Sequence, residues 1–449
     1  MIKVITYGSY DMLHYGHVRL LKRAKALGDY LIVGVTSDDY DKTRGKINLQ
    51  QTLMERIEAV KNTGIADEVI VEEYEGQKID DIMRYGVDIF TVGSDWIGYF
   101  DYLNEYCKVI YLPRTEGVSS TEIRSVKTSL KIGLSGSAMF LEKVASEAKY
   151  VNGINVIGIY ADNTDLIPDS LQSLSVVTTD QEKLFDSCDA VYIHSTPAKH
   201  YTQTRQAILA GKHVLCESPI AYSKKESAEL FELAHEHNVV LMEAIRTAYS
   251  TAYQRMLLLL KAGKIGQVIS VDVTCTSMKS ITRENDPVLE NKWNSLSTWG
   301  PTGLLPVFQI LGTDYIRKTI ISHVREQEDK NKFDLFTKID FIYSSSVASV
   351  KVGRGVKSEG ELIVSGTKGY IYVPSPWWKT DYFEVRYENP ADNRRYFYQL
   401  DGEGIRYELA AFSRAIQKII NTVQIDEKVT NAISGIMEDY YKGNDQYLI

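Results

Sequence analysis

The feature that most constrains the fold is an alternation of short apolar strands and amphipathic helices along the first 127 residues. Segments typical of buried strands occur at 3–8, 30–36, 67–71, 87–93 and 108–112. The stretches between them favour helices: "HVRLLKRAKALGD" (17–29) has helical apolar spacing, a second helix ends near Thr63, and one more precedes each of the last two strands. This alternation predicts an α/β fold with a parallel, Rossmann-like sheet that binds ligands at the carboxyl ends of its strands.

A second alternation follows a polar stretch near residue 129. Further strands are predicted at 131–134, 155–162, 190–197, 212–219 and 239–244. From about residue 265 the pattern changes to long alternating segments, which predict an open antiparallel sheet, at 267–278, 338–353, 360–373 and 382–388. "IRYELAAFSRAIQKII" (405–420) predicts an amphipathic helix. We therefore expect three domains: residues 1–128, a second Rossmann domain at 130–248, and an α+β open-sheet domain with C-terminal helices at 249–449.

Composition narrows the function classes. The net charge of −8 argues against a general binder of nucleic acid or anionic membranes. No apolar run of about 18 residues predicts a membrane span. The N-terminus is typical of a strand and lacks a signal-peptide layout. The four cysteines lie far apart without a C-x-x-C pair, which fits a reducing compartment with neither a disulfide framework nor a zinc site. We expect a cytoplasmic protein with small-molecule substrates.

The segment "YDMLHYGHVRL" (10–20) contains two of the chain's eight histidines, His14 and His17, in the turn after the first strand. The start of a helix offers backbone N–H groups and a partial positive charge. Two imidazoles there can donate to phosphate oxygens, and Gly16 lets the backbone approach a ligand closely. This arrangement predicts nucleotidyl transfer without a covalent nucleophile, in which pyrophosphate leaves the α-phosphate, normally with Mg²⁺.

Two polar segments are further candidates for phosphate binding. "RTEGVSSTEIR" (114–124) begins with Arg114 and continues with a capping-box pattern that includes Ser119 and Thr121, so it is either a second phosphate cradle or a plain helix cap. The loop "DKTRGKI" supplies Arg44 and Lys46, either as a phosphate clamp or as a solvated loop.

A third segment, "GSDWIGYFDY" (93–102), places Asp95 and Trp96 directly after a strand, where a base or ribose could be bound.

Three motifs together, "TYGSYDMLHYGH", "GSDWIGYFDYL" and "YLPRTEGVSSTEIR", resemble the glycerol-3-phosphate cytidylyltransferases over residues 1–127. The resemblance implies a homodimeric nucleotidyltransferase that makes CDP-glycerol and pyrophosphate from CTP and glycerol 3-phosphate for teichoic-acid-like or capsular polymers. It assigns catalysis to His14, His17 and Arg114, nucleotide binding to Tyr7, Gly8, Asp11, Gly16, Asp95, Trp96, Thr115, Ser119 and Thr121, and acceptor or phosphate binding to Asp38, Arg44, Lys46 and Arg56.

This sequence departs from the family pattern near the acceptor positions. The loop before Arg56 is one residue longer, and the position of a second family arginine falls near Gly64. The acceptor therefore stays open between glycerol 3-phosphate and a related polyol phosphate, such as glycerol 2-phosphate or ribitol 5-phosphate.

The segment at 191–222, with its strand "GKHVLCESP", resembles the glucose–fructose oxidoreductase and inositol dehydrogenase superfamily, and the resemblance extends over about residues 130–449. It implies an NAD(P)-binding Rossmann domain followed by an open-sheet domain. The glycine fingerprint is thin, with Gly133 and Gly136 as weak dinucleotide-binding candidates. Asp162 is placed to meet an adenosine ribose or is simply a polar residue at a strand end.

The chemical residues of that superfamily are replaced here. Its lysine is Ser218, its aspartate falls on Pro306, and its histidine or tyrosine falls near Ile310. His200 is expected to shape the fold rather than act in catalysis. Three hypotheses follow for the second half: an oxidoreductase domain that has lost its chemistry, an NAD(P)-dependent reductase that supplies the polyol phosphate, or a non-catalytic platform for dimerisation or docking.

Overall fold

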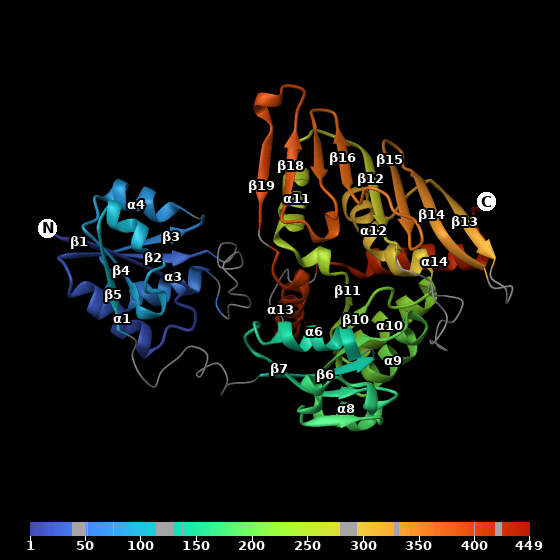
Figure 1. Cartoon of the computed structure of the whole chain (residues 1–449), viewed down its shortest axis with the longest axis horizontal. Helices are drawn as coiled ribbons and strands as arrows, with labels where there is room; N and C mark the ends of the chain where they lie inside the picture. Colours follow the sequence, from blue (N-terminus) through green and yellow to red (C-terminus); the bar gives the residue numbers. More distant parts are fainter. Residues whose placement is uncertain are drawn as a thin grey trace. The chain divides into compact units, whose positions relative to one another are not determined.

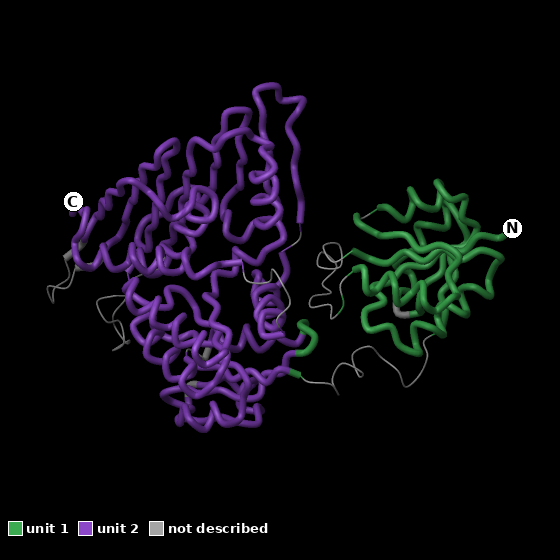
Figure 2. The backbone as a smooth tube through the Cα atoms, turned by 180° about the vertical axis from the view of Figure 1, so that it is seen from behind, with its two compact units in different colours: residues 1–129, 150–153 green, residues 130–149, 154–449 purple. Residues whose placement is uncertain are grey.

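The structure is a computed structural model that describes residues 1–37, 51, 53–74, 76–113, 129–136, 138–278, 294–326, 332–398, 400–417 and 424–449. Its contacts divide the chain into two compact units (Figure 2). Unit 1 comprises Met1–Ser129 and Tyr150–Gly153, and unit 2 comprises Leu130–Lys149 and Ile154–Ile449. The segments 130–248 and 249–449, expected as separate domains, thus lie in the same unit.

Unit 1 is built on one parallel sheet with the strand order β3-β2-β1-β4-β5 (Figure 1). Its strands are β1 (Lys3–Gly8), β2 (Tyr30–Thr36), β3 (Glu68–Glu72), β4 (Ile89–Gly93) and β5 (Lys108–Leu112), and its helices are α1 (Tyr15–Lys25), α3 (Leu53–Asn62) and α4 (Gln77–Tyr85). The chain runs outward from β1 to β3 on one side and from β4 to β5 on the other. The sheet therefore has its topological switch point between β1 and β4.

The central strands of unit 1, β1, β2 and β4, are largely buried on both faces, as expected for a parallel sheet. Val4 and Ile5 are neighbours in β1 and both are fully buried, but they belong to different apolar clusters. The Val4 cluster includes residues of α1 and α3, whereas the Ile5 cluster includes Ile82 of α4. Helices thus cover both faces and leave the strand ends for ligands.

Two of the predicted helices differ from the observed elements. The first begins at Tyr15 and ends at Lys25, because the side chain of His14 caps its start. The third, expected before β5, is instead two 3-10 segments, Ser94–Trp96 and Asp101–Glu105. Gly98 lies between them with a left-handed φ of 84°, which interrupts a continuous helix.

The first layer of unit 2 is a six-stranded parallel sheet with the order β11-β10-β9-β6-β7-β8. Its switch point lies between β6 and β9. Its strands are β6 (Leu130–Gly136), β7 (Ile154–Tyr160), β8 (Val176–Thr178), β9 (Ala190–His194), β10 (His213–Glu217) and β11 (Leu241–Ala244). Its helices are α6 (Ala138–Ala148), α7 (Asp169–Gln172), α8 (Gln181–Ser187), α9 (Pro197–Leu209) and α10 (Lys224–Glu236), with a 3-10 segment at Thr164–Leu166.

The second layer is a nine-stranded sheet with the order β19-β18-β17-β16-β12-β15-β14-β13-β20 (Figure 1). Its strands are β12 (Val268–Thr276), β13 (Arg317–Glu326), β14 (Lys332–Ile342), β15 (Val347–Gly353), β16 (Leu362–Gly366), β17 (Tyr370–Val373), β18 (Tyr382–Arg386), β19 (Arg394–Phe397) and β20 (Gln446–Leu448). Its helices are α11 (Thr251–Lys261), α12 (Ser295–Leu311), α13 (Ile405–Ile416) and α14 (Glu427–Lys442). Short 3-10 segments lie at Arg246–Tyr249, Trp377–Lys379, Pro390–Asp392 and Asp401–Gly404.

This sheet is mixed rather than purely antiparallel. β12 pairs with β15 in parallel and with β16 antiparallel, and β13 pairs with β20 in parallel. The crossover from β12 to β15 passes through α12 and the β13–β14 hairpin, and such a long connection allows a parallel pair. The late helix α13 packs against α6 of the first layer, which explains why the two layers form one unit.

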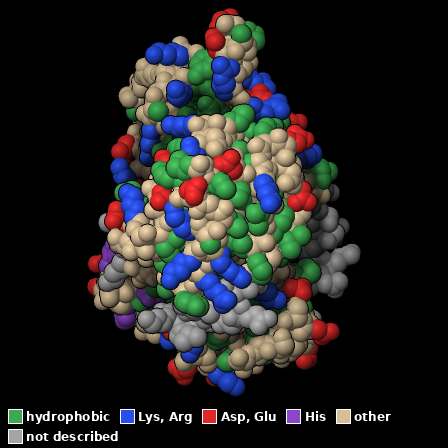
Figure 3. All heavy atoms as spheres, turned by 90° about the vertical axis from the view of Figure 1, so that its left-hand side faces the viewer, with side chains coloured by type: hydrophobic (Ala, Val, Ile, Leu, Met, Phe, Trp, Pro, Cys, Tyr) green, Lys and Arg blue, Asp and Glu red, His purple; other side chains and the backbone are tan. Residues whose placement is uncertain are grey.

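Two surface properties complete the description. Basic and acidic side chains both occur across the face seen in Figure 3, as expected for a chain with 51 basic and 59 acidic residues. Within the described ranges, no helix combines the length and the apolar character needed to span a membrane.

Candidate functional site

The topology of unit 1 brings two predicted segments to one place. β1 and β4 are neighbours in the sheet, with Thr6 paired to Thr91, and both chains leave the sheet at its carboxyl edge (Figure 1). His14 and His17 follow β1, and the Ser94–Trp96 turn follows β4. Because this is the switch point of the sheet, a ligand crevice is expected between these two loops.

His14 and His17 cap the start of helix α1 through reciprocal hydrogen bonds. The backbone N–H of Gly16 donates to His14 Nδ1 at 3.1 Å, and the backbone N–H of His14 donates to His17 Nδ1 at 3.4 Å. The two rings stack with their centroids 4.0 Å apart and an angle of 24° between their planes. This is a reciprocal capping box in which imidazoles take the usual places of Ser or Thr and Glu.

These bonds determine which ring nitrogen carries the proton. A nitrogen that accepts a backbone N–H has no hydrogen, so each neutral ring carries its hydrogen on Nε2. Both imidazoles are therefore prepared as Nε2–H donors, which suits phosphate oxygens that gain charge during a reaction. We expected the first helical N–H groups to face the ligand; instead the N–H of Gly16 is used to orient His14.

The turn that carries the histidines has an unusual backbone. Tyr10 and Met12 have left-handed φ values of 52° and 48°, a conformation that costs non-glycine residues about 1–3 kcal/mol each. The ring of Tyr10 is buried and meets His17 edge-on, with 5.6 Å between ring centroids. A Cβ on Gly8 would lie 3.1 Å from Tyr10 Cζ, so the glycine makes room for this ring. The role of Tyr10 was not predicted from the sequence.

Asp11 and Gln51 tie this turn to the segment before α3. Asp11 is fully buried, and its Oδ1 accepts the backbone N–H of Gln51 at 3.0 Å. The Gln51 side chain in turn accepts the backbone N–H of Met12 at 2.7 Å. Asp11, predicted to bind the nucleotide, thus has a clear role in shaping the loop. Gln51 was missed because a glutamine 37 residues beyond His14 gives no sequence signal of this contact.

Arg56 holds the exits of two strands together. Its guanidinium is fully buried and donates to the backbone oxygens of Ser9 at 2.6 Å and Thr36 at 2.8 Å. These residues directly follow β1 and end β2, respectively. The structure therefore gives Arg56 a positioning role at these two strand exits.

The side chain of Tyr7 lies away from the strand ends. It is buried, and its hydroxyl donates to Asp81 Oδ2 at 2.9 Å. Burial, followed by the charge of Asp81, raises the pKa of Tyr7. Lys78 lies 4.8 Å from the Tyr7 ring centroid and pairs with the buried Glu72. The Tyr7 side chain therefore belongs to the core of unit 1.

Trp96 is partly buried in an aromatic cluster, with ring centroids 5.4 Å from Tyr99 and 5.8 Å from Phe100. It lies in the loop after β4, together with the other aromatic residues of this cluster. Several predicted site residues lie outside the described residues: Asp38, Arg44, Lys46, Arg114, Thr115, Ser119 and Thr121. The backbone of Asp95 belongs to the 3-10 segment Ser94–Trp96, but its side chain is also outside the described part.

Comparison with known proteins matches this site to a family. Residues 5–126 match the family model described as cytidylyltransferase-like. The glycerol-3-phosphate cytidylyltransferase of Bacillus spizizenii is 48% identical over 130 residues, which cover 29% of this chain and 100% of that protein. The Staphylococcus aureus enzyme of the same name is 46% identical over 124 residues, which cover 28% of this chain and 93% of that protein. The chain belongs to the glycerol-3-phosphate cytidylyltransferase family. This membership concerns the N-terminal part alone.

The second part of the chain matches another family. Residues 130–245 match the model described as oxidoreductase family, NAD-binding Rossmann fold. A 3-ketoreductase from Actinomadura kijaniata, solved with NADP, superposes with a TM-score of 0.60 at 14% identity, covering 72% of this chain and 100% of that one. An oxidoreductase from Agrobacterium radiobacter gives 0.59 at 18% identity, covering 71% and 96%. These structures share the fold, and the predicted fusion of the two domain types is confirmed.

Two of the residues predicted as weak dinucleotide-binding candidates follow or end strands of the six-stranded sheet at its carboxyl edge. Gly136 has a φ of 123°, and a Cβ there would lie 1.9 Å from the backbone oxygen of His194, so the tight turn requires glycine. Asp162 is well exposed, and Lys199 donates to it at 2.9 Å. Gly133 has a packing role instead, because a Cβ there would meet Leu184 at 2.9 Å.

The residues that stand in place of the oxidoreductase superfamily's catalytic residues contact other parts of this protein or are buried in it. Ser218 Oγ donates to Glu243 Oε1 at 2.8 Å, and burial raises the pKa of Glu243 to about 7. Pro306 is buried inside α12, which also contains Ile310. The ring nitrogens of the buried His200 lie 2.8 Å from the Pro219 oxygen and 3.1 Å from the Ser195 oxygen, which agrees with a structural role.

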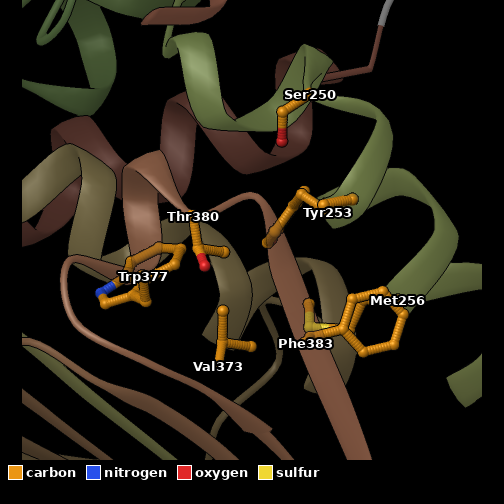
Figure 4. A pocket seen from close by; sticks show the side chains of 8 residues that line it. Ser250, Tyr253, Met256, Val373, Trp377, Thr380 and Phe383 are labelled. Atoms are coloured by element: carbon orange, nitrogen blue, oxygen red, sulfur yellow. The ribbon is translucent and has the colours of Figure 1, made fainter. Parts of the chain in front are cut away.

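A small cavity elsewhere in unit 2 is separate from these positions. Figure 4 shows the largely apolar side chains around it, which come from α11 and from the strands and turn near Trp377. Its lining consists of Ser250, Ala252, Tyr253, Met256, Val373, Trp377, Thr380 and Phe383. None of the predicted site residues contributes to it.

Proposed function

We propose that unit 1 transfers CMP from CTP to glycerol 3-phosphate and forms CDP-glycerol and pyrophosphate. The observation that carries this proposal is the capping arrangement of His14 and His17, which orients both rings through Nδ1 and places the hydrogen of each neutral ring on Nε2. The pair follows β1 at the switch point of the sheet, in a chain that belongs to the glycerol-3-phosphate cytidylyltransferase family.

In this reaction a phosphate oxygen of the acceptor attacks the α-phosphorus of CTP. The bond from that phosphorus to the β-phosphate oxygen breaks, and pyrophosphate leaves without a covalent enzyme intermediate. His14 and His17 donate hydrogen bonds to phosphate oxygens as their negative charge grows. Arg44, Lys46 and Arg114 are proposed as further phosphate contacts, together with Asp38. Mg²⁺ enters with the phosphates of CTP, as is usual for this hard cation.

The nucleoside is proposed to bind beside the loop after β4. Trp96 and Asp95 would meet the base or ribose, and Thr115, Ser119 and Thr121 would complete the nucleotide site. The product would supply glycerol phosphate units for a teichoic-acid-like or capsular polymer, with unit 1 acting as a homodimer.

We propose that unit 2 does not perform hydride transfer, in contrast to the oxidoreductase superfamily that it resembles. Its proton-donating lysine is replaced by Ser218, which already donates to Glu243. Gly136 and Asp162 would still hold the adenosine end of NAD(P), which keeps a reductase that makes the polyol phosphate as the alternative. Protection of unit 2 against heat by NADH or NADPH would favour that alternative over a platform without ligand.

A panel of acceptors tests the proposed transferase. The full chain is incubated with CTP, Mg²⁺ and one of glycerol 3-phosphate, glycerol 2-phosphate or ribitol 5-phosphate, and pyrophosphate release is measured. We expect release with at least one acceptor and the highest rate with glycerol 3-phosphate. If none of the three supports release above the acceptor-free control, the proposal is wrong; if another acceptor is preferred, only the substrate assignment changes.

A further inference from the structure

Three cationic side chains of unit 2 converge on one carboxylate, Glu403. Lys143 in α6 pairs with Glu403 Oε1. Lys379, at the end of the Trp377–Lys379 turn, lies 2.6 Å from Glu403 Oε2. Arg246, the first residue of the Arg246–Tyr249 segment, lies 3.5 Å from the same oxygen. The cations come from three segments far apart in the sequence. We call these four side chains the Glu403 cluster.

The backbone around Glu403 is suited to releasing it. Gly402, Glu403 and Gly404 have consecutive left-handed φ values of 56°, 53° and 87°. Glu403 is the non-glycine residue among them, and such strain occurs at ligand clamps and switches, where the surroundings hold it in place. The two flanking glycines can change conformation at low cost, so the glutamate can swing outward.

The three cations of the cluster stabilise a negative charge at the position of the Glu403 carboxylate. Desolvation alone would raise the pKa of Glu403, yet hydrogen bonds from Lys143 and Lys379 hold that pKa at about 2. All four side chains are partly exposed, with 27% of Arg246 and 37% of Glu403 accessible. A soluble anion can therefore reach the positions that the glutamate carboxylate occupies.

Two buried or partly buried acidic residues, Glu217 and Glu408, also lie next to Arg246. The Tyr192 hydroxyl lies 2.8 Å from Glu217 Oε1 and 3.0 Å from Glu408 Oε1, but one hydroxyl hydrogen cannot serve two acceptors. Burial, followed by the charge of Glu217, raises the pKa of Glu408 well above its usual range. Glu217 and Glu408 are both close enough to Arg246 to act on its charge.

Lys143, Arg246 and Lys379 thus present three cationic groups to one carboxylate, that of Glu403. Aromatic rings support Arg246. Its guanidinium carbon lies 5.1 Å from the centroid of the Phe140 ring, which in turn stacks on His194 with 4.1 Å between ring centroids.

We propose that Lys143, Arg246 and Lys379 form a binding site for the phosphate group of a phosphorylated small molecule, and that Glu403 occupies this site in the ligand-free chain. A phosphate monoester has several acceptor oxygens, so it can accept charge-assisted hydrogen bonds from more than one of the three cations at once. This site is independent of the transferase site proposed in unit 1.

The test uses the full chain with Glu403→Gln, which keeps the shape of the side chain and removes its charge. Inorganic phosphate is titrated at constant ionic strength, and amide hydrogen exchange is followed in the peptide 400–406. This local measurement separates binding at the cluster from binding by unit 1. Because the competing carboxylate is gone, we expect Glu403→Gln to bind phosphate about tenfold more tightly than the unsubstituted chain. A second titration with glycerol 3-phosphate shows whether the site reads the phosphate alone or the ester as well.

Asp340→Asn is the matched control, since Asp340 is a comparably exposed carboxylate 2.9 Å from Lys338. It should leave phosphate binding unchanged, whereas adding Lys379→Met to Glu403→Gln should abolish it. Unchanged exchange in the 400–406 peptide of folded Glu403→Gln at saturating phosphate would overturn the proposal. If that variant does not fold, the unsubstituted chain and Lys379→Met are compared at high phosphate. Protection lost in Lys379→Met supports the site, and equal behaviour of the two contradicts it.

Discussion

Substituting His14 by asparagine or by alanine separates the two roles that the structure gives this residue. His14 caps α1 through Nδ1 and is proposed to donate to phosphate through Nε2. Asparagine is among the best N-cap residues, so His14→Asn should keep the cap while it removes the Nε2–H donor. Alanine removes both.

The expected magnitudes follow from these contacts. Loss of one preorganised donor to a transition-state oxygen should lower kcat about 10²–10³-fold in both variants. Loss of the cap costs about 1 kcal/mol, so only His14→Ala should raise the opening equilibrium of α1, by about fivefold. Pyrophosphate release from CTP gives kcat, and amide hydrogen exchange in the peptide 15–25 reports the opening of α1.

Two results would refute this reasoning. Near-normal turnover in His14→Asn would mean that the imidazole is not needed as a donor. Equal exchange of the α1 amides in His14→Ala and His14→Asn would mean that the capping contact contributes nothing to the helix.

The remaining predictions concern the other parts of the chain. A fragment of residues 1–129 should release pyrophosphate at a rate close to that of the full chain; an inactive, folded fragment would show that unit 2 completes the site. Arg56→Met should destabilise unit 1 by about 3 kcal/mol in thermal melts, because two buried backbone oxygens lose a charged donor, and a change below 0.5 kcal/mol would contradict this. Burial raises the pKa of Glu243 to about 7, so the folded state binds more protons than the unfolded state, and the stability of the fold falls as the pH rises from about 4.5 through 7. Glu243→Gln should therefore raise the melting temperature of unit 2 at pH 8 but not at pH 4.5. An equal rise at both pH values would contradict the raised pKa of Glu243. With Ser218 in place of the lysine, the chain should show no NADH- or NADPH-dependent reduction of triose phosphates, and turnover lost on Asp162→Ala would establish the bifunctional alternative.

The strands of unit 1 could be predicted from the sequence because each is a compact apolar run. β1, β2 and β5 begin and end where the apolar pattern does. The helix expected before β5 was wrong, since apolar spacing alone does not reveal that Gly98 and the aromatic residues around it favour short 3-10 turns. The parallel pairing of β12 with β15 was also outside reach, because alternation specifies a strand's faces but not its partner.

The site shows a similar division. The motif itself indicated His14 and His17, because two of the chain's eight histidines occur together in the turn after the first strand. The supporting residues could not be found in this way. Tyr10, Gln51 and the buried role of Arg56 depend on contacts between segments that only the folded chain brings together.

The most direct test of the account follows the α-phosphate itself. The full chain is incubated with CTP labelled at the α-phosphorus, with Mg²⁺ and glycerol 3-phosphate, and the label is traced in the products and on the protein. The account predicts that the label moves into CDP-glycerol in step with pyrophosphate release, that none is bound covalently to the protein, and that His17→Ala slows the transfer about 10²–10³-fold. Label held covalently by the protein, or undiminished transfer in His17→Ala, would contradict direct transfer assisted by the two histidines.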